Sequence, residues 1–278
     1  MLDLAVAGFG PQFASLQALI TGGQDALATA RILLAQAQAG GHLAALLPAE
    51  TPLLAPIPRP LKNVFCVGRN YVDHFAEGAR AQNRRVEVTE VPVFFTKPPT
   101  AMIGTAADIP YWPHLSNSTD YEVELAVIIG KPGLNIRCKD AMDHVFGYTI
   151  LNDITARDLQ RRHGGQYFKG KGLDGSCPMG PVVVTKDALH DPHNIGLRSH
   201  VNGEVRQNRT TSAMIFDIPS LIASLSEGLT LEPGDILATG TPSGVGYAMT
   251  PPRFLTDGDR VTCEIDGIGQ LVNTVRAM

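Results

Sequence analysis

The feature that most constrains the fold is a ten-residue run, YEVELAVIIG, from Tyr121 to Gly130. β-branched residues favour an extended backbone, and a continuous apolar run is typical of a strand buried inside a sheet. Runs rich in apolar and β-branched residues, bounded by turn residues, predict further strands at 63–67, 93–96, 145–152, 181–185, 197–201, 236–239, 260–265 and 270–275. The dipeptide Asp266-Gly267 separates the last two and is a strong hairpin signal.

Helical segments are fewer in the same part of the chain. We predict helices at 71–81, 154–162 and 212–226. The 28 glycines and 20 prolines agree with many tight turns between short strands. Because most connections look like hairpins and not helical crossovers, we predict an α+β fold with a β-rich mixed or antiparallel sheet.

The first 60 residues have a different character. Residues 13–47 are rich in Ala, Leu and Gln with apolar positions at helical spacing, which predicts one or two helices split near Gly22 and Gly23. Five prolines between Pro48 and Pro60 deny the backbone both helix and central strand. We therefore predict a small N-terminal cap domain with a proline-rich linker at 1–60, and a catalytic domain at 61–278.

Charge and composition argue against several classes of partner. With 23 basic and 27 acidic side chains the net charge is −4, so no excess of cations is available for nucleic acid or an anionic membrane surface. No apolar run approaches the length of a membrane span. The start of the chain carries Asp3 and no basic leader, which predicts a cytoplasmic protein without a secretory signal. The four cysteines include no C-x-x-C pair and are predicted to be reduced core thiols: Cys66, Cys138, Cys177 and Cys263.

Two carboxylates lie in the first strand described above. Residues two apart on a strand share a face, so Glu122 and Glu124 point the same way. A solvated acidic face explains the pattern equally simply, but the apolar residues that follow indicate a strand entering the interior. Two carboxylates on one inward face repel each other unless one is protonated or a cation lies between them.

A third carboxylate, Asp153, ends the strand GYTILND where a helix is predicted to begin. One interpretation is a helix N-cap, since Asp accepts hydrogen bonds from the free N–H groups of a first turn. The other is a ligand: together with Glu122 and Glu124 it makes an all-oxygen site suited to Mg²⁺, with Mn²⁺ or Ca²⁺ as substitutes.

Two further segments contain residues that could take part in catalysis or in ligand binding. If a helix begins near Tyr71, His74 and Glu77 are neighbours at i and i+3, either as a carboxylate-held general base or as an exposed ion pair. The glycine-rich segment 238–246 lacks the Gly-Lys-Ser/Thr of a phosphate loop. It is either a structural turn or a turn whose N–H groups hold a smaller anion such as a carboxylate.

In their order and in their residues, these segments resemble sequences of the fumarylacetoacetate hydrolase family from about Leu61 to the C-terminus. The matching stretches are GRNYVDHFAE, FFTKPPTAMIG, YEVELAVIIG, GYTILNDITARDLQ, GKGLDGSCPMGP, VNGEVRQ and PGDILATGTPSGVG. The resemblance implies a mixed β-roll and a homodimer. It also implies a Mg²⁺ or Mn²⁺ site at Glu122, Glu124 and Asp153, and a water-activating dyad of His74 and Glu77.

Pocket residues follow from the same resemblance. Lys171 is implied as a catalytic residue, and the substrate-binding residues are Arg69, Asn70, Tyr71, Gln160 and Thr241. The chain departs from many relatives after the pocket lysine, where Gly172 and Leu173 replace a Ser and often a Phe, which predicts a wider pocket wall. The charged segment 80–91 is either a lid over an anionic substrate or a solvated loop.

The activity expected from this resemblance is hydrolysis of a carbon–carbon bond. The predicted substrate is a small oxo acid, a β-diketo acid such as an acylpyruvate of the fumarylpyruvate type, from the catabolism of aromatic or related compounds. The alternative keeps the cation and the enolate without the attacking water: a decarboxylase, an isomerase of a hydroxymuconate-type diacid, or a lyase. A binding protein without activity on the same fold is a third reading, because fold alone does not determine function.

Overall fold

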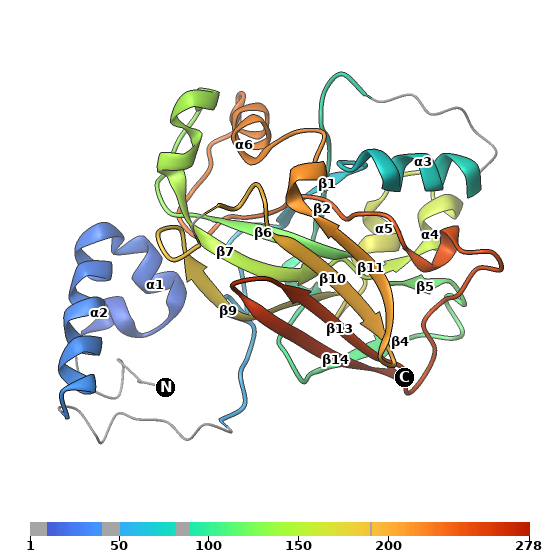
Figure 1. The fold of residues 1–278 in the computed structure, drawn as a ribbon, viewed down its shortest axis with the longest axis horizontal. Helices are drawn as coiled ribbons and strands as arrows, with labels where there is room; N and C mark the ends of the chain where they lie inside the picture. Colours follow the sequence, from blue (N-terminus) through green and yellow to red (C-terminus); the bar gives the residue numbers. More distant parts are fainter. Residues whose placement is uncertain (1–9, 41–50, 82–88, 190) are drawn as a thin grey trace.

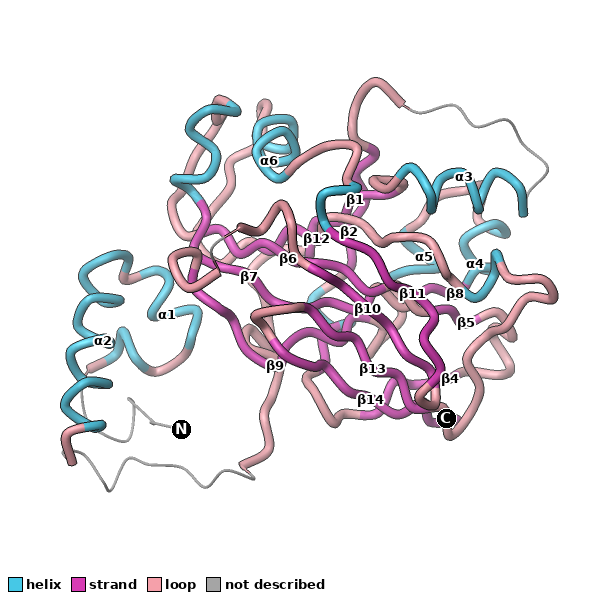
Figure 2. The backbone as a smooth tube through the Cα atoms, in the orientation of Figure 1, coloured by secondary structure: helices cyan, strands magenta, loops and turns pink. Residues whose placement is uncertain are grey.

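The computed structural model describes residues 10–40, 51–81, 89–189 and 191–278. Strands gather in the middle and helices lie at the periphery (Figure 2). One sheet has seven strands, in the order β2 (Val93–Lys97), β1 (Val64–Gly68), β12 (Ile236–Ala238), β6 (Val123–Ile129), β7 (Val145–Asn152), β9 (Cys177–Thr185) and β3 (Met102–Ile103). A second has five, in the order β11 (Glu204–Thr210), β10 (Gly196–Val201), β13 (Arg260–Ile265), β14 (Gly269–Ala277) and β4 (Asp108–Tyr111). A two-stranded ribbon pairs β5 (Thr119–Asp120) with β8 (Thr155–Ala156).

Helices lie on two opposite sides of the strands (Figure 1). On one side are α1 (Leu16–Thr21) and α2 (Gly23–Gln38), and on the other α3 (Val72–Ala81), α4 (Arg157–Arg162) and α5 (Phe168–Lys171). The remaining α-helix is α6 (Ile218–Ser226). Short 3-10 turns lie at Pro11–Phe13, Pro99–Ala101, Cys138–His144, Thr211–Ala213 and Gly246–Ala248. The predicted α+β class with mixed sheets is confirmed: β1–β12, β3–β9 and β4–β14 are parallel, and the other pairs are antiparallel.

The central strand β6 is buried on both faces, as its sequence predicts. Leu125 and Val127 pack into one hydrophobic cluster with residues of the five-stranded sheet. Ala126 and Ile128 pack into a second cluster, together with Ile20 of α1. Side chains alternate between faces with a period of two, so each face of the strand serves a different cluster.

Several element boundaries differ from the prediction for local reasons. The helix predicted at 154–162 begins only at Arg157, because Thr155 and Ala156 pair with β5. The helix predicted at 212–226 begins at Ile218, where Asp217 is the N-cap and its side chain accepts a hydrogen bond from the N–H of Ser220. Strand β11 was not predicted, although Asn202-Gly203 before it is a hairpin signal.

In the N-terminal part, the predicted split between helices at Gly22 and Gly23 is confirmed. Residues 51–60 form neither helix nor strand. The part of the predicted cap at 1–9 and 41–50 lies outside the described residues, and the division at residue 60 stays a prediction. None of the helices in the described ranges has the length and apolar character needed to cross a membrane.

All four cysteines are free, as predicted. Cys66, Cys177 and Cys263 are buried, and burial raises the pKa of the Cys177 thiol to about 12. Cys138 is exposed, so the prediction of a core position is wrong for it. It begins a surface 3-10 turn that leads into β7.

Candidate active site

Antiparallel pairing of β6 with β7 brings Asp153 beside Glu122 and Glu124, which belong to the other strand. Val123 at the start of β6 faces Asn152 at the end of β7, and the Asp153 N–H donates to the Glu122 carbonyl at 2.9 Å. Carboxylate oxygens of Glu122, Glu124 and Asp153 lie within 4.8 Å of one another, and all three residues are buried. The interpretation of a solvated acidic face is therefore wrong.

Asp153 also does not cap a helix. The N-cap of α4 is Ala156, and the Asp153 carboxylate accepts from two buried lysines instead. Lys97 Nζ lies 2.7 Å from Asp153 Oδ1, and Lys171 Nζ lies 2.6 Å from Asp153 Oδ2. Lys97 also donates to the carbonyls of Ile154 and Lys171, which fixes this part of the backbone around its ammonium group.

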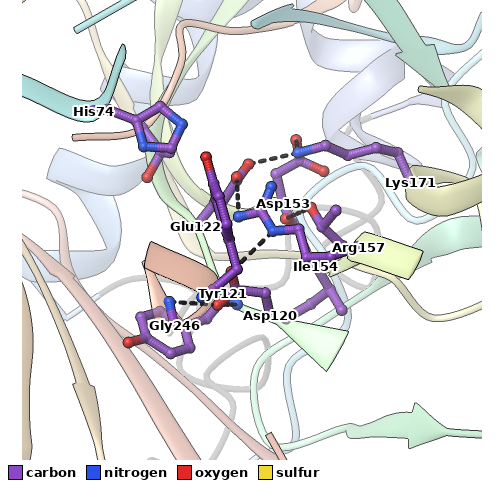
Figure 3. Close-up of polar contacts among 12 residues, drawn as sticks. His74, Asp120, Tyr121, Glu122, Asp153, Ile154, Arg157, Lys171 and Gly246 are labelled. Atoms are coloured by element: carbon purple, nitrogen blue, oxygen red, sulfur yellow. Dashed lines mark hydrogen bonds and ion pairs between the residues drawn. The ribbon is translucent and has the colours of Figure 1, made fainter. Parts of the chain in front are cut away.

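Glu122 is compensated by two cations (Figure 3). Lys171 Nζ lies 2.5 Å from Glu122 Oε2, and Arg157 Nη2 lies 2.6 Å from Glu122 Oε1. Burial alone would raise the pKa of Glu122, but the charges of Arg157 and Lys171 outweigh it and hold that pKa well below its usual range. Burial alone would lower the pKa of Lys171, but the charges of Asp153 and Glu122 outweigh that effect and raise it, so its side chain stays an ammonium group.

Glu124 is in the opposite situation. Its carboxylate accepts from the Gly240 N–H at 2.8 Å and makes no ion pair with a described residue. Burial, reinforced by the charges of Asp153 and Glu122, raises the pKa of Glu124 well above its usual range. Three buried carboxylates, one of them without a cation, fit a divalent ion with hard oxygen ligands.

A histidine on α3 stands beside this cluster. His74 Nδ1 lies 3.0 Å from Glu77 Oε1, and the two side chains are only 10% and 12% exposed, so the interpretation as an exposed ion pair is wrong. Both Glu77 oxygens accept from the Gly244 N–H, at 3.1 and 2.9 Å. Since Nδ1 is engaged, Nε2 is the ring nitrogen available for proton transfer in the cavity.

The glycine-rich segment organises this site through its backbone N–H groups. Gly240 donates to Glu124, Gly244 donates to Glu77, and Gly246 and Tyr247 donate to Asp120. The expectation that these groups hold a small anion is met by the chain's own carboxylates. At Gly244, with φ +107°, a Cβ would lie 2.0 Å from the Arg206 carbonyl oxygen, so the close approach requires glycine.

Asp120 and Arg157 were not predicted as site residues. Asp120 Oδ2 accepts from Arg157 Nε at 2.9 Å, and the Arg157 guanidinium lies 4.3 Å from the centre of the Tyr247 ring. Asp120 directly precedes the Tyr-Glu-Val-Glu run and Arg157 lies in the Ala-Arg-Asp-Leu-Gln segment. Each belongs to a segment that the sequence analysis had singled out, but no local pattern predicts an ion pair between residues 37 positions apart.

These groups surround a cavity of about 510 Å³. The predicted site residues that line it are Arg69, His74, Glu122, Glu124, Gln160, Lys171 and Thr241. Lining residues that the prediction missed are Val67, Gly68, Phe95, Arg157, Arg161, Gly164, Gly165, Tyr167 and Tyr247. The predicted wall position Gly172 packs near Pro98, and neither it nor Leu173 lines the cavity.

Asn70 and Tyr71 are predicted substrate ligands that the structure places behind the cavity wall. The Asn70 amide donates to the carbonyls of Phe216 and Thr239 and accepts from the Phe216 N–H, so it joins two backbone segments. The Tyr71 hydroxyl is buried without a hydrogen-bond partner among the described residues. Burial and the charge of Glu124 raise the pKa of Tyr71.

Thr241 lines the cavity, but its hydroxyl is engaged. It donates to the Val123 carbonyl and accepts from Gln207 Nε2, both within 2.8 Å. Gln207 lies in the VNGEVRQ stretch, and its side-chain oxygen also accepts from the Val123 N–H. Gln207 therefore ties the glycine-rich segment to the strand that carries the glutamates. The predicted lid at 80–91 falls largely on residues outside the described ranges.

The chain is similar to proteins of known family. The model of the fumarylacetoacetate (FAA) hydrolase C-terminal family matches residues 63–276. Oxaloacetate tautomerase YisK of Bacillus subtilis is 51% identical over 226 residues, 81% of this chain and 73% of the relative. The human mitochondrial oxaloacetate tautomerase FAHD2A is 46% identical, over 84% of this chain and 73% of its own. Among solved structures, a fumarylacetoacetate hydrolase from Exiguobacterium antarcticum is 42% identical with a TM-score of 0.78, covering 95% of this chain and 88% of that chain.

The comparisons overturn the predicted reaction. The prediction of carbon–carbon bond hydrolysis in an acylpyruvate is wrong, because the curated relatives at 46–51% identity are oxaloacetate tautomerases. Tautomerisation moves one proton and breaks no carbon–carbon bond, so it requires no attacking water. The alternative reading, a decarboxylase, isomerase or lyase of a 2-oxo or hydroxymuconate-type diacid, agrees better with these relatives through its isomerase option.

Proposed function

The chain belongs to the fumarylacetoacetate hydrolase family, and from that premise we propose that it is a cation-dependent tautomerase of a 2-oxo dicarboxylic acid such as oxaloacetate. The reaction interconverts the keto and enol forms of the substrate. In the keto-to-enol direction C3 loses a proton and the oxygen on C2 gains one, so atoms and charge balance within the substrate.

The observation that carries this proposal is that His74, Lys171 and two carboxylates, Glu122 and Glu124, line one cavity. The third carboxylate, Asp153, does not line the cavity but lies within 4.8 Å of the other two and is ion-paired to Lys171. Glu122, Glu124 and Asp153 would hold the divalent cation, with Mg²⁺ or Mn²⁺ as the best match to oxygen ligands. When bound, the cation supplies Lewis acidity that makes a neighbouring C–H more acidic.

The chain's own residues account for the proton transfer. His74 accepts the C3 proton at Nε2, because Nδ1 is held by Glu77. The Glu77 carboxylate, fixed by the Gly244 N–H, stabilises the imidazolium that forms. Lys171 stays charged beside Asp153 and Glu122 and offsets negative charge that develops on the substrate oxygen. The proton then passes from His74 to that oxygen, which completes the enol.

The test is the rate at which the ultraviolet absorbance of enol-oxaloacetate is lost after enzyme is added, with Mg²⁺ and again with a chelator. We expect chelator-sensitive loss of absorbance, and no matching release of pyruvate in a coupled lactate dehydrogenase assay. Stoichiometric release of pyruvate would show that the protein decarboxylates the substrate and is not a tautomerase. An absorbance rate equal to the uncatalysed rate under all metal conditions would refute the proposal.

The predicted homodimer and cytoplasmic location are parts of the proposal that need their own measurements. Light scattering coupled to gel filtration measures the mass of the assembly directly. A mass near 29.7 kDa, that of one chain, would exclude the dimer.

A further inference from the structure

Two neighbouring arginines at the end of α4 differ in their surroundings. Arg161 lines the cavity, and Arg162 does not, although both are exposed. The next lining residues along the chain, Gly164 and Gly165, have positive φ angles of 68° and 79°. A Cβ added at either would meet nothing within 4 Å, so the cavity is open beside Arg161.

The cations that line the cavity fall into two pairs. Lys171 is bonded to Glu122 and Asp153, and Arg157 is bonded to Glu122 and Asp120. The other two cations, Arg69 and Arg161, form no ion pair with a described residue. The Arg69 guanidinium lies 5.4 Å from the centre of the Phe75 ring, and Arg161 is exposed to solvent. The cavity therefore carries positive charge that its own carboxylates do not neutralise.

An apolar wall belongs to the same cavity. The rings of Phe95 and Tyr167 meet edge to face with centroids 5.2 Å apart, and both line the cavity. A ligand with two anionic ends joined by a short carbon chain matches this arrangement: one end at the carboxylate triad with its cation, the chain against the rings, and the other end at a free guanidinium.

We propose that Arg161 determines specificity by binding the distal carboxylate of a 2-oxo or 2-hydroxy diacid. This inference rests on the proposed function for the choice of substrate class. The guanidinium presents a planar fork of donors that matches a carboxylate in two parallel hydrogen bonds. A monocarboxylic acid with hydrogen in place of the distal carboxylate lacks the group that Arg161 binds, so Arg161 separates diacids from monoacids.

The experiment compares L-malate with L-lactate, two unreactive 2-hydroxy acids that differ at the distal carboxylate. Isothermal titration calorimetry gives the dissociation constant of each for the full chain saturated with Mg²⁺. We expect malate to bind more tightly than lactate to the wild type, and Arg161→Gln to reduce that ratio by roughly 10- to 100-fold. Lactate affinity stays unchanged, and Arg161→Lys gives an intermediate ratio because a point charge replaces the fork.

Arg162→Gln is the matched control, since it removes an adjacent surface charge that does not line the cavity, and its ratio should equal that of the wild type. An unchanged ratio in Arg161→Gln overturns the inference, as does a wild type that binds malate no more tightly than lactate. Unchanged lactate binding shows that the variant is folded.

The binding result does not depend on turnover. A malate preference that disappears in Arg161→Gln supports the inference even if enol-oxaloacetate is not consumed. Conversely, tautomerase activity with an unchanged KM for oxaloacetate in Arg161→Gln keeps the proposed function and refutes the role of Arg161. For a specificity role we expect KM to rise by roughly the same factor as the malate dissociation constant, with kcat within about 3-fold of the wild type.

Discussion

The floor and the mouth of the cavity differ in how their charges are compensated. What we call the floor consists of the lining residues Glu122, Glu124, Arg157 and Lys171 together with Asp153, which is ion-paired to Lys171 without lining the cavity itself. All five are buried and, apart from Glu124, joined in one network of ion pairs. The mouth consists of Arg161, Gly164 and Gly165, which are all exposed. Buried charges are stable only when they are paired, whereas an exposed arginine is compensated by water.

This difference indicates a division of labour. The floor is fixed by many mutual bonds, so it provides a preorganised environment for chemistry. The mouth has few bonds to break, so it can adapt to the substrate at little energetic cost. The single uncompensated group of the floor, Glu124, marks the place where a cation is needed.

The largest effect is expected at Asp153, in the floor. Asp153→Ala removes one of the three carboxylates and leaves the fully buried Lys97 ammonium without its carboxylate. We expect loss of Mg²⁺-dependent activity and a fall of about 3–5 kcal/mol in the free energy of unfolding, measured by urea denaturation. Asp153→Asn keeps the volume and one acceptor oxygen, and should lose activity with a smaller loss of stability. Equal stability of Asp153→Ala and the wild type would show that the floor is not a connected network.

At His74 the effect should fall on rate alone. His74→Ala removes the proposed base without removing a carboxylate, so kcat should drop by roughly 100- to 10,000-fold. The rise in melting temperature on addition of Mg²⁺ should stay within experimental error of the wild type, because the triad is intact. Activity close to that of the wild type would exclude His74 as the base.

Two glycine substitutions compare a residue that positions the catalytic groups, Gly244, with a residue at the mouth of the cavity, Gly165. Gly244→Ala forces a Cβ against the Arg206 carbonyl and displaces the N–H that holds Glu77. It should therefore lower kcat by at least about 10-fold, a smaller fall of the same kind as that expected for His74→Ala. Gly165→Ala meets no neighbouring atom and should cost about 1–2 kcal/mol of stability from its left-handed backbone, with kcat unchanged. Similar kinetics in both variants would contradict the distinction.

The smallest effect is a pH dependence of stability that originates at Glu124. Its raised pKa means that, above the usual carboxyl range, the folded protein keeps a proton that the unfolded chain has lost. The stability of the metal-free protein therefore decreases as pH rises through that window, and the melting temperature gained from Mg²⁺ grows with pH.

Glu124→Gln removes this titration. The metal-free variant should melt at a higher temperature than the metal-free wild type at pH 8, and it should lose most of the Mg²⁺ response. Differential scanning fluorimetry between pH 5 and 8 measures both quantities. A Mg²⁺ response that is independent of pH in the wild type would argue against an uncompensated carboxylate at this position.

Local patterns in the sequence predicted a large part of the fold. Strands β7 and β13 have the predicted bounds, and β6 and β14 begin and end within two residues of theirs, because a period of two and a turn dipeptide act over short distances. The His74–Glu77 contact was predictable for the same reason, since i and i+3 on one helix are always neighbours. Helix starts were less predictable where a residue such as Thr155 pairs with a strand that is distant in sequence.

The sequence by itself indicated candidate residues for the cation and for proton transfer, and which of them share a strand face or a helix turn. Tertiary structure decided which charges meet: the register of β6 against β7 places Asp153 beside Glu122, and Lys97, Asp120 and Arg157 complete the network from other elements. It also decided that the N–H groups of the glycine-rich segment bind the chain's own carboxylates. The physical reason is that backbone geometry is set by near neighbours, whereas the compensation of a buried charge requires partners that only the folded chain brings within hydrogen-bond distance.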